Sequence, residues 1–120
     1  MTTEIEKMKY HIRMLAEALD YEEHPIPYLV VEFDWDDRQL TKAHDIFEKY
    51  DRLLTEGKTP SWSELENDLK DEFDIGYQEV KSIVNAFYSN SQWGNVCYWF
   101  AKGQEPTCPM ELKHIVEARG

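Results

Sequence analysis

The chain has 120 residues, 42% apolar and 13% aromatic, enough for one domain with a hydrophobic core and too few for two ordinary domains. Its formal net charge of −11 argues against direct binding to nucleic acid or to an anionic membrane, since both require a cationic surface. No stretch approaches the roughly 18 consecutive apolar residues of a membrane span. The N-terminus lacks the basic start and apolar run of a signal peptide, so we expect a cytoplasmic protein.

The negative charge is concentrated in the N-terminal part of the chain. Residues 1–75 hold 20 acidic and 9 basic side chains, whereas residues 76–120 hold four of each. Residues 17–37 contain eight carboxylates and neither Lys nor Arg. Such a run is most often a solvated surface, and the functional alternative is a surface that meets a cation or a basic protein. The candidate partner surface comprises Glu22, Glu23, Asp34, Asp36, Asp37, Glu66, Asp68, Asp71 and Glu72.

The two cysteines, Cys97 and Cys108, form no C-x-x-C motif and are too few for a disulfide framework. We interpret both as reduced thiols, as expected in the cytosol. Cys97 lies within an apolar segment, and we expect it to be an inert part of the core.

The first predicted helix covers residues 3–20. Its apolar side chains recur at steps of three and four, the spacing of a helix that packs lengthwise on another helix. They form the first stripe, which comprises Ile5, Met8, Ile12, Leu15 and Leu19. Thr3 and Glu6 match a capping box at its start. We expect the other helices to be arranged around this helix and a second one with the same pattern.

The segment 25–33 combines two prolines with a dense apolar run that includes Val30, Val31 and Phe33. Val and Phe favour a strand, but no other stretch alternates convincingly and could pair with one. Because Pro25 and Pro27 suit the first turn of a helix, we predict a short buried helix.

The second helix of the predicted pair covers residues 36–55. Asp36 and Gln39 match a capping box, and Gly57 is a natural residue to follow its end. Its apolar face forms the second stripe, which comprises Leu40, Ala43, Phe47, Tyr50 and Leu54.

Another capping box, Ser61 with Glu64, opens a helix predicted for residues 61–73. Its opposite face is strongly acidic. Asp74 and Gly76 interrupt the chain after it.

Further helices are predicted over residues 77–88 and 92–102, the second ending at Gly103. Gly94 lies inside this second helix, where glycine costs about 1 kcal/mol against Ala, so we expect another backbone to come close to it. We assign residues 1–103 to the helical domain and residues 104–120 to a tail. The tail contains a short helix, too weak to form without something to pack on.

Aromatic side chains are concentrated between Tyr77 and Phe100. Trp93, Tyr98, Trp99 and Phe100 leave both sides of their helix apolar, which indicates burial on both sides. Two interpretations remain open: these residues form only the core, or they form the core and a candidate apolar interface with another subunit or partner.

No metal site is predicted. Asp34, Asp36 and Asp37 resemble the start of a calcium loop, but the later ligand positions are not those of such a loop. Glu111 and His114 form a single E-x-x-H pair, whereas di-iron bundles need two such pairs and two more Glu residues. His44 and Glu48, four residues apart, are better explained as neighbours on a helix surface.

No catalytic residue and no cofactor site is predicted either. The sequence has no G-x-S-x-G motif, neither cysteine has a His at a motif distance, and no glycine-rich phosphate loop is present. We therefore expect the chain not to be an enzyme.

The order of the elements resembles a known family, the YhaI-like proteins, small uncharacterised proteins of bacilli. The matching features, within residues 5–102, are the Tyr10–Ile12 step on a helix with an acidic end at Asp20, the Pro-led run Pro25–Val31, the D-x-x-Q cap at Asp36, the S-x-x-E-L-x-x-x-L segment Ser61–Leu69 and the aromatic C-terminal helices. The resemblance implies an all-helical, dimeric fold. It implies no activity and no catalytic residues.

Together these patterns predict a compact all-α bundle of about five to six helices that forms a homodimer through its apolar stripes. The expected function is that of a non-catalytic protein-interaction module. The alternative is an acidic inhibitor, a nucleic-acid mimic of the kind encoded by phages or acting as immunity proteins, that blocks a basic site on a partner protein.

Overall fold

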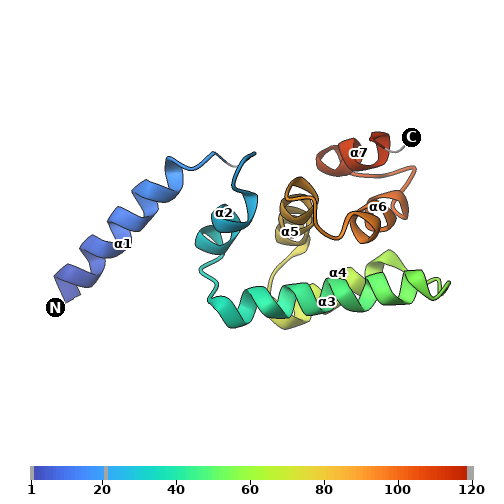
Figure 1. Cartoon of the computed structure of the whole chain (residues 1–120), viewed down its shortest axis with the longest axis horizontal. Helices are drawn as coiled ribbons and strands as arrows, with labels where there is room; N and C mark the ends of the chain where they lie inside the picture. The colour runs from blue at the N-terminus through green and yellow to red at the C-terminus, as the bar shows by residue number, and fades with distance from the viewer. Residues whose placement is uncertain (1, 21, 119–120) are drawn as a thin grey trace.

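The protein is built from helices. A computed structural model describes residues 2–20 and 22–118, and over those ranges it contains seven α-helices and no strand (Figure 1). The helices are α1 (Thr2–Glu17), α2 (Pro25–Glu32), α3 (Asp37–Thr55), α4 (Trp62–Phe73), α5 (Tyr77–Ser89), α6 (Gly94–Lys102) and α7 (Met110–Glu117). The all-α prediction is confirmed, and the described residues hold one or two more helices than the predicted five to six.

Two helix starts form as their local sequence predicts. The Asp36 side chain accepts from the Gln39 amide at 2.9 Å, and the Gln39 side chain accepts in return from the Asp36 amide at 2.8 Å. Ser61 and Glu64 make the corresponding capping box before α4. Each box satisfies backbone N–H groups that have no partner within the helix, which fixes where α3 and α4 begin.

Other boundaries differ from the prediction. The first helix begins at Thr2 and ends at Glu17, so Thr3 lies inside it and is not a cap. The start of α6 is Gly94 and not residue 92, because Trp93 adopts a left-handed backbone with φ of 55° and serves as the N-cap. The indole N–H of this residue donates to the side chain of His44 on α3.

The hydrophobic core is organised around α5. This helix contacts α2, α4, α6 and α7, and its side chains Val80, Ile83, Val84 and Phe87 have no exposed surface. The second stripe also faces the core, since Ala43, Phe47 and Tyr50 are at most 1% exposed. The expectation that the chain is arranged around α1 and α3 is therefore right for α3 and wrong for α1.

The C-terminal helix packs on the body of the molecule. Leu112 and Ile115 of α7 are fully buried against α5 and α6. This contact supplies the packing partner that so short a helix needs.

A close approach between α4 and α6 occurs at Gly103, and the approach predicted at Gly94 stays a prediction. A Cβ atom at Gly103 would lie 2.8 Å from Cδ1 of Trp62, closer than packed side chains allow. Only glycine therefore lets the end of α6 lie on the Trp62 ring.

The first helix projects from the rest of the molecule. Figure 1 shows α1 extending away from α2–α7, with its N-terminal end farthest out, and the chain measures 54 × 25 × 22 Å. None of the described helices is long and apolar enough to cross a membrane. We refer to α2–α7 as the body.

Candidate functional site

Most of the exposed large apolar side chains lie on α1, and Met110 of α7, which is 77% exposed, lies apart from them. The first stripe is exposed by 53% at Ile5, 56% at Met8, 53% at Ile12 and 70% at Leu15, while Leu19 lies beyond the end of the helix. In this chain the stripe thus has no helix packed along it, which overturns the expectation that α1 packs lengthwise inside the domain. A folded helix with an uncovered apolar face marks a site for a partner.

The opposite side of α1 is also solvated. Tyr10 and Met14 point away from the first stripe and are 61% and 47% exposed. What distinguishes the stripe is its continuity, since its members follow one another at steps of three and four along one face.

A groove separates α1 from the body. It has a volume of 680 Å³ and is lined on one side by Ile12, Ala16 and other residues of α1. Its other wall is formed by α2 and the turn after it, including Val31, which is 39% exposed, and Trp35. Ile12 of the first stripe thus faces the groove, and it remains 53% exposed there.

The predicted acidic surface is divided between two regions. Glu22, Glu23, Asp34, Asp36 and Asp37 are exposed on the segments before and after α2. Asp36 also serves as the cap of α3, so its carboxylate is engaged by a backbone amide.

On α4 the acidic side chains are partly neutralised by nearby groups. Glu66 pairs with Lys70 at 2.6 Å. Asp68 accepts from Lys49 at 3.1 Å and from the Tyr50 hydroxyl at 2.5 Å. The remaining two predicted carboxylates, Asp71 and Glu72, are exposed beside a hollow between α3 and α4.

The predicted aromatic interface lies largely inside the body. Phe100 is fully buried, and Trp93, Tyr98 and Trp99 are half-buried. The indole N–H of Trp93 donates to Nδ1 of His44 at 3.0 Å, and that of Trp99 donates to the carbonyl of Pro60 at 3.2 Å. These bonds tie α6 to α3 and to the start of α4, which is a core role.

The bond between Trp93 and His44 depends on the charge state of the imidazole. Burial lowers the pKa of His44 below its usual range, against the opposing effect of Asp45. A neutral His44 can accept the indole proton, whereas the protonated ring has no free acceptor.

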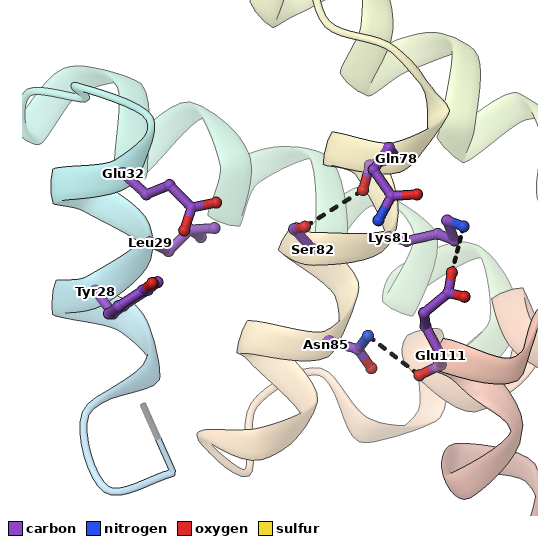
Figure 2. Close-up of a pocket in the computed structure, with 8 residues that line it drawn as sticks. All are labelled: Tyr28, Leu29, Glu32, Gln78, Lys81, Ser82, Asn85 and Glu111. Atoms are coloured by element: carbon purple, nitrogen blue, oxygen red, sulfur yellow. Dashed lines mark hydrogen bonds and ion pairs between the residues drawn. The ribbon is translucent and has the colours of Figure 1, made fainter. Parts of the chain in front are cut away.

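A small polar pocket lies where α2, α5 and α7 meet (Figure 2). Its volume is 190 Å³. Figure 2 shows Leu29 and Glu32 of α2 on one side of α5, while Lys81 and Asn85 reach toward Glu111 of α7.

The polar groups of this pocket connect α7 to α5. The Lys81 ammonium, with a side chain only 11% exposed, donates to the carboxylate of Glu111, and the side-chain amide of Asn85 donates to the Glu111 carbonyl at 3.2 Å. The bond from Lys81 lowers the pKa of Glu111. The carboxylate thus stays ionised and paired, which suits a structural contact.

The hydroxyl of Tyr77 and the thiol of Cys108 stay protonated at neutral pH because their pKa values are raised. Burial, followed by the charge of Glu66, raises the pKa of Tyr77 to about 12, and its hydroxyl donates to Gln104. Burial also raises the pKa of the Cys108 thiol. Both cysteines are buried, and neither forms a disulfide within the described residues.

The two members of each pair considered as metal ligands interact with different partners in the fold. Glu111 binds Lys81 while His114 packs against the ring of Tyr88, and Glu48 pairs with Arg52 while His44 binds Trp93. Within residues 2–20 and 22–118, no three His, Cys, Asp or Glu side chains are grouped so that they could hold a metal ion.

Sequence reasoning missed the groove beside α1 and the ion pair between Lys81 and Glu111. The signal for the ion pair was present, since Lys81 stands between Val80 and Ile83 on a face that otherwise enters the core. The groove left no such signal, because it depends on the angle between α1 and α2.

In comparisons with known proteins, no family model, curated protein or solved structure matches the chain. The resemblance to the YhaI-like proteins therefore stays a prediction, and the first stripe is the candidate site with the clearest structural basis.

Proposed function

We propose that this chain is a non-catalytic, self-associating interaction module, and that the first stripe of α1 is its contact surface. The observation that carries this proposal is the exposure of Ile5, Met8, Ile12 and Leu15, each more than half exposed on one continuous face. Side chains of this kind are normally buried, and a second copy of the same face would cover them.

The energetics favour a weak dimer. Burying an exposed Leu, Ile or Met side chain is worth about 1.5–3 kcal/mol, while association costs about 4–15 kcal/mol in lost freedom. Four such side chains from each helix give a modest surplus. We therefore expect dimerisation to depend strongly on protein concentration.

The charge of α1 permits such pairing. The helix carries Glu4, Glu6 and Glu17 against Lys7, Lys9 and Arg13, so it is neutral, although the whole chain carries −11. Two copies of α1 can thus approach each other without net repulsion, which two acidic surfaces of the body could not do as readily.

The test is sedimentation velocity with light scattering over a wide range of protein concentration. We expect the wild-type chain to dimerise as concentration rises and Leu15→Glu to remain a monomer. Met14→Glu is the matched control, because Met14 is exposed on the opposite side of the same helix and should leave the dimer intact. A wild-type chain that stays monomeric at every concentration would overturn the proposal.

A second candidate function, the acidic inhibitor, is favoured by one observation. Glu22, Glu23, Asp34 and Asp37 are exposed around α2, in a segment without Lys or Arg. They would mimic phosphates before a basic site of a partner protein. Pull-down of basic proteins from a bacterial lysate, washed at low and at high salt, tests this function, and binding that does not change with salt would count against it.

A further inference from the structure

The residue types in the first stripe and the charges beside it indicate the orientation of its partner helix. We propose that α1 pairs with α1 of a second copy as a parallel two-stranded coiled coil, in which Glu4 of each copy meets Lys9 of the other. This inference rests on the self-association proposed above and specifies its geometry.

The residue types along the stripe favour two parallel strands. In heptad notation Ile5 and Ile12 occupy a positions, while Met8 and Leu15 occupy d positions. A β-branched side chain at a with an unbranched or γ-branched one at d is the combination that packs best in parallel dimers. All four side chains are more than half exposed in the single chain, so their outer surfaces are accessible to a second helix.

The charges beside the stripe are complementary in the same orientation. Glu4 occupies a g position, and Lys9 occupies the e position five residues later. In a parallel coiled coil a g residue faces the e residue of the next heptad on the other helix, which gives two symmetric ion pairs. In a fully overlapped antiparallel pair, Lys9 would instead face Lys9 and His11 would face His11.

The position of α1 allows this arrangement. The helix projects from the body (Figure 1), and the groove beside Ala16 separates it from α2 on the e side. In a parallel dimer the two acidic bodies lie at the same end, beyond Glu17. Their repulsion falls off within about 8 Å at physiological ionic strength, so it weakens the dimer without excluding it.

Cross-linking through Ile5→Cys tests the orientation. In the parallel dimer the two introduced thiols face each other, and oxidised glutathione should convert them to an interchain disulfide, itself being reduced. In a fully overlapped antiparallel dimer each introduced thiol lies opposite Leu15 of the other helix. The two thiols are then about 15 Å apart along the helix axis, which is beyond disulfide reach. The native Cys97 and Cys108 are buried and do not compete.

The matched control for cross-linking is Tyr10→Cys, which places the thiol on the opposite face of α1 and should give no covalent dimer. A dimer by light scattering whose Ile5→Cys variant does not cross-link would overturn the parallel orientation and leave self-association standing. A chain that is monomeric throughout would instead remove the self-association on which this inference rests.

Charge exchange tests the ion pairs separately. Glu4→Lys and Lys9→Glu should each raise the dissociation constant about threefold to tenfold, because each variant places like charges together at two points. A mixture of the two variants should recover dimerisation as a heterodimer, and the double variant should recover it as a homodimer. Single variants that dimerise as well as the wild type would show that Glu4 and Lys9 do not meet.

Discussion

Two helices of this protein carry the same apolar pattern and meet opposite surroundings. In α3 the second stripe has Ala43, Phe47 and Tyr50 at most 1% exposed, whereas in α1 the members of the first stripe are 53% exposed or more. The comparison shows that a periodic apolar face predicts the need for a partner helix but does not tell whether that partner belongs to the same chain.

The connections after each helix explain the difference. A short turn at Gly57, with φ of +81°, lets α4 fold back along α3. After α1 the chain runs through an acidic segment to Pro25, and only then does α2 join the body (Figure 1). The prolines start a new helix directed at α5, and α1 is left outside.

The largest expected effect is a difference in stability between a substitution in the body and one on α1. Phe87→Ala should lower the free energy of unfolding by about 3–5 kcal/mol, because the Phe87 ring is fully buried. Its centroid lies 4.7 Å from that of the Phe47 ring. Leu15→Ala should change it by no more than about 0.5 kcal/mol in dilute solution. Urea unfolding of both variants checks this, and similar losses would mean that α1 packs on the body after all.

A smaller effect is expected at the contact between α4 and α6. Gly103→Ala should destabilise the body by about 1–3 kcal/mol, because the added methyl group overlaps the Trp62 ring. At most other helix ends with ordinary backbone angles, the same change is neutral or stabilising. Thermal unfolding measures the difference.

Combining Gly103→Ala with Trp62→Ala provides the control. If the ring causes the loss, the double variant loses less stability than the two single losses added together. Strict additivity would contradict this explanation.

The smallest expected effect concerns pH. The pKa of His44 is lowered in the folded chain, so between that value and 6.5 the unfolded chain binds more protons. The free energy of unfolding should therefore fall as the pH is lowered through this window. Above the window, the contribution of neutral His44 is fully present. His44→Asn keeps an acceptor for Trp93 but does not titrate, so its unfolding midpoint should change less between neutral and mildly acidic pH. Equal pH dependence of both chains would exclude His44 as the cause.

The fold was predictable where the determining residues are close in sequence. Capping boxes at Asp36 and Ser61 fix the starts of α3 and α4, and Gly57 and Asp74 follow their ends with positive φ values. The start of α6 was missed because Trp93 adopts a left-handed backbone, which its local sequence does not predict, and its indole is bonded to His44, 49 residues away.

The candidate site was predictable in composition and not in position. The spacing of the first stripe was evident from the sequence, and its role in association stays a prediction. That α1 stands outside the body depends on packing of α2 against α5, which no local pattern reveals. In the same way, the sequence showed that the helix around Trp99 is apolar on both sides. The bonds from Trp93 to α3 and from Trp99 to the carbonyl of Pro60, before α4, became evident only in the fold.

The projection of α1 also governs how a protease would see the chain. Before Arg38 the chain has three trypsin sites, at Lys7, Lys9 and Arg13, and all three lie on a helix that can open without disturbing the core. Brief treatment with trypsin should therefore clip the N-terminal end first and leave the body intact. Since a paired helix must separate before it can be cut, the rate of cleavage at Arg13 would report, without any label, how much of the protein is associated.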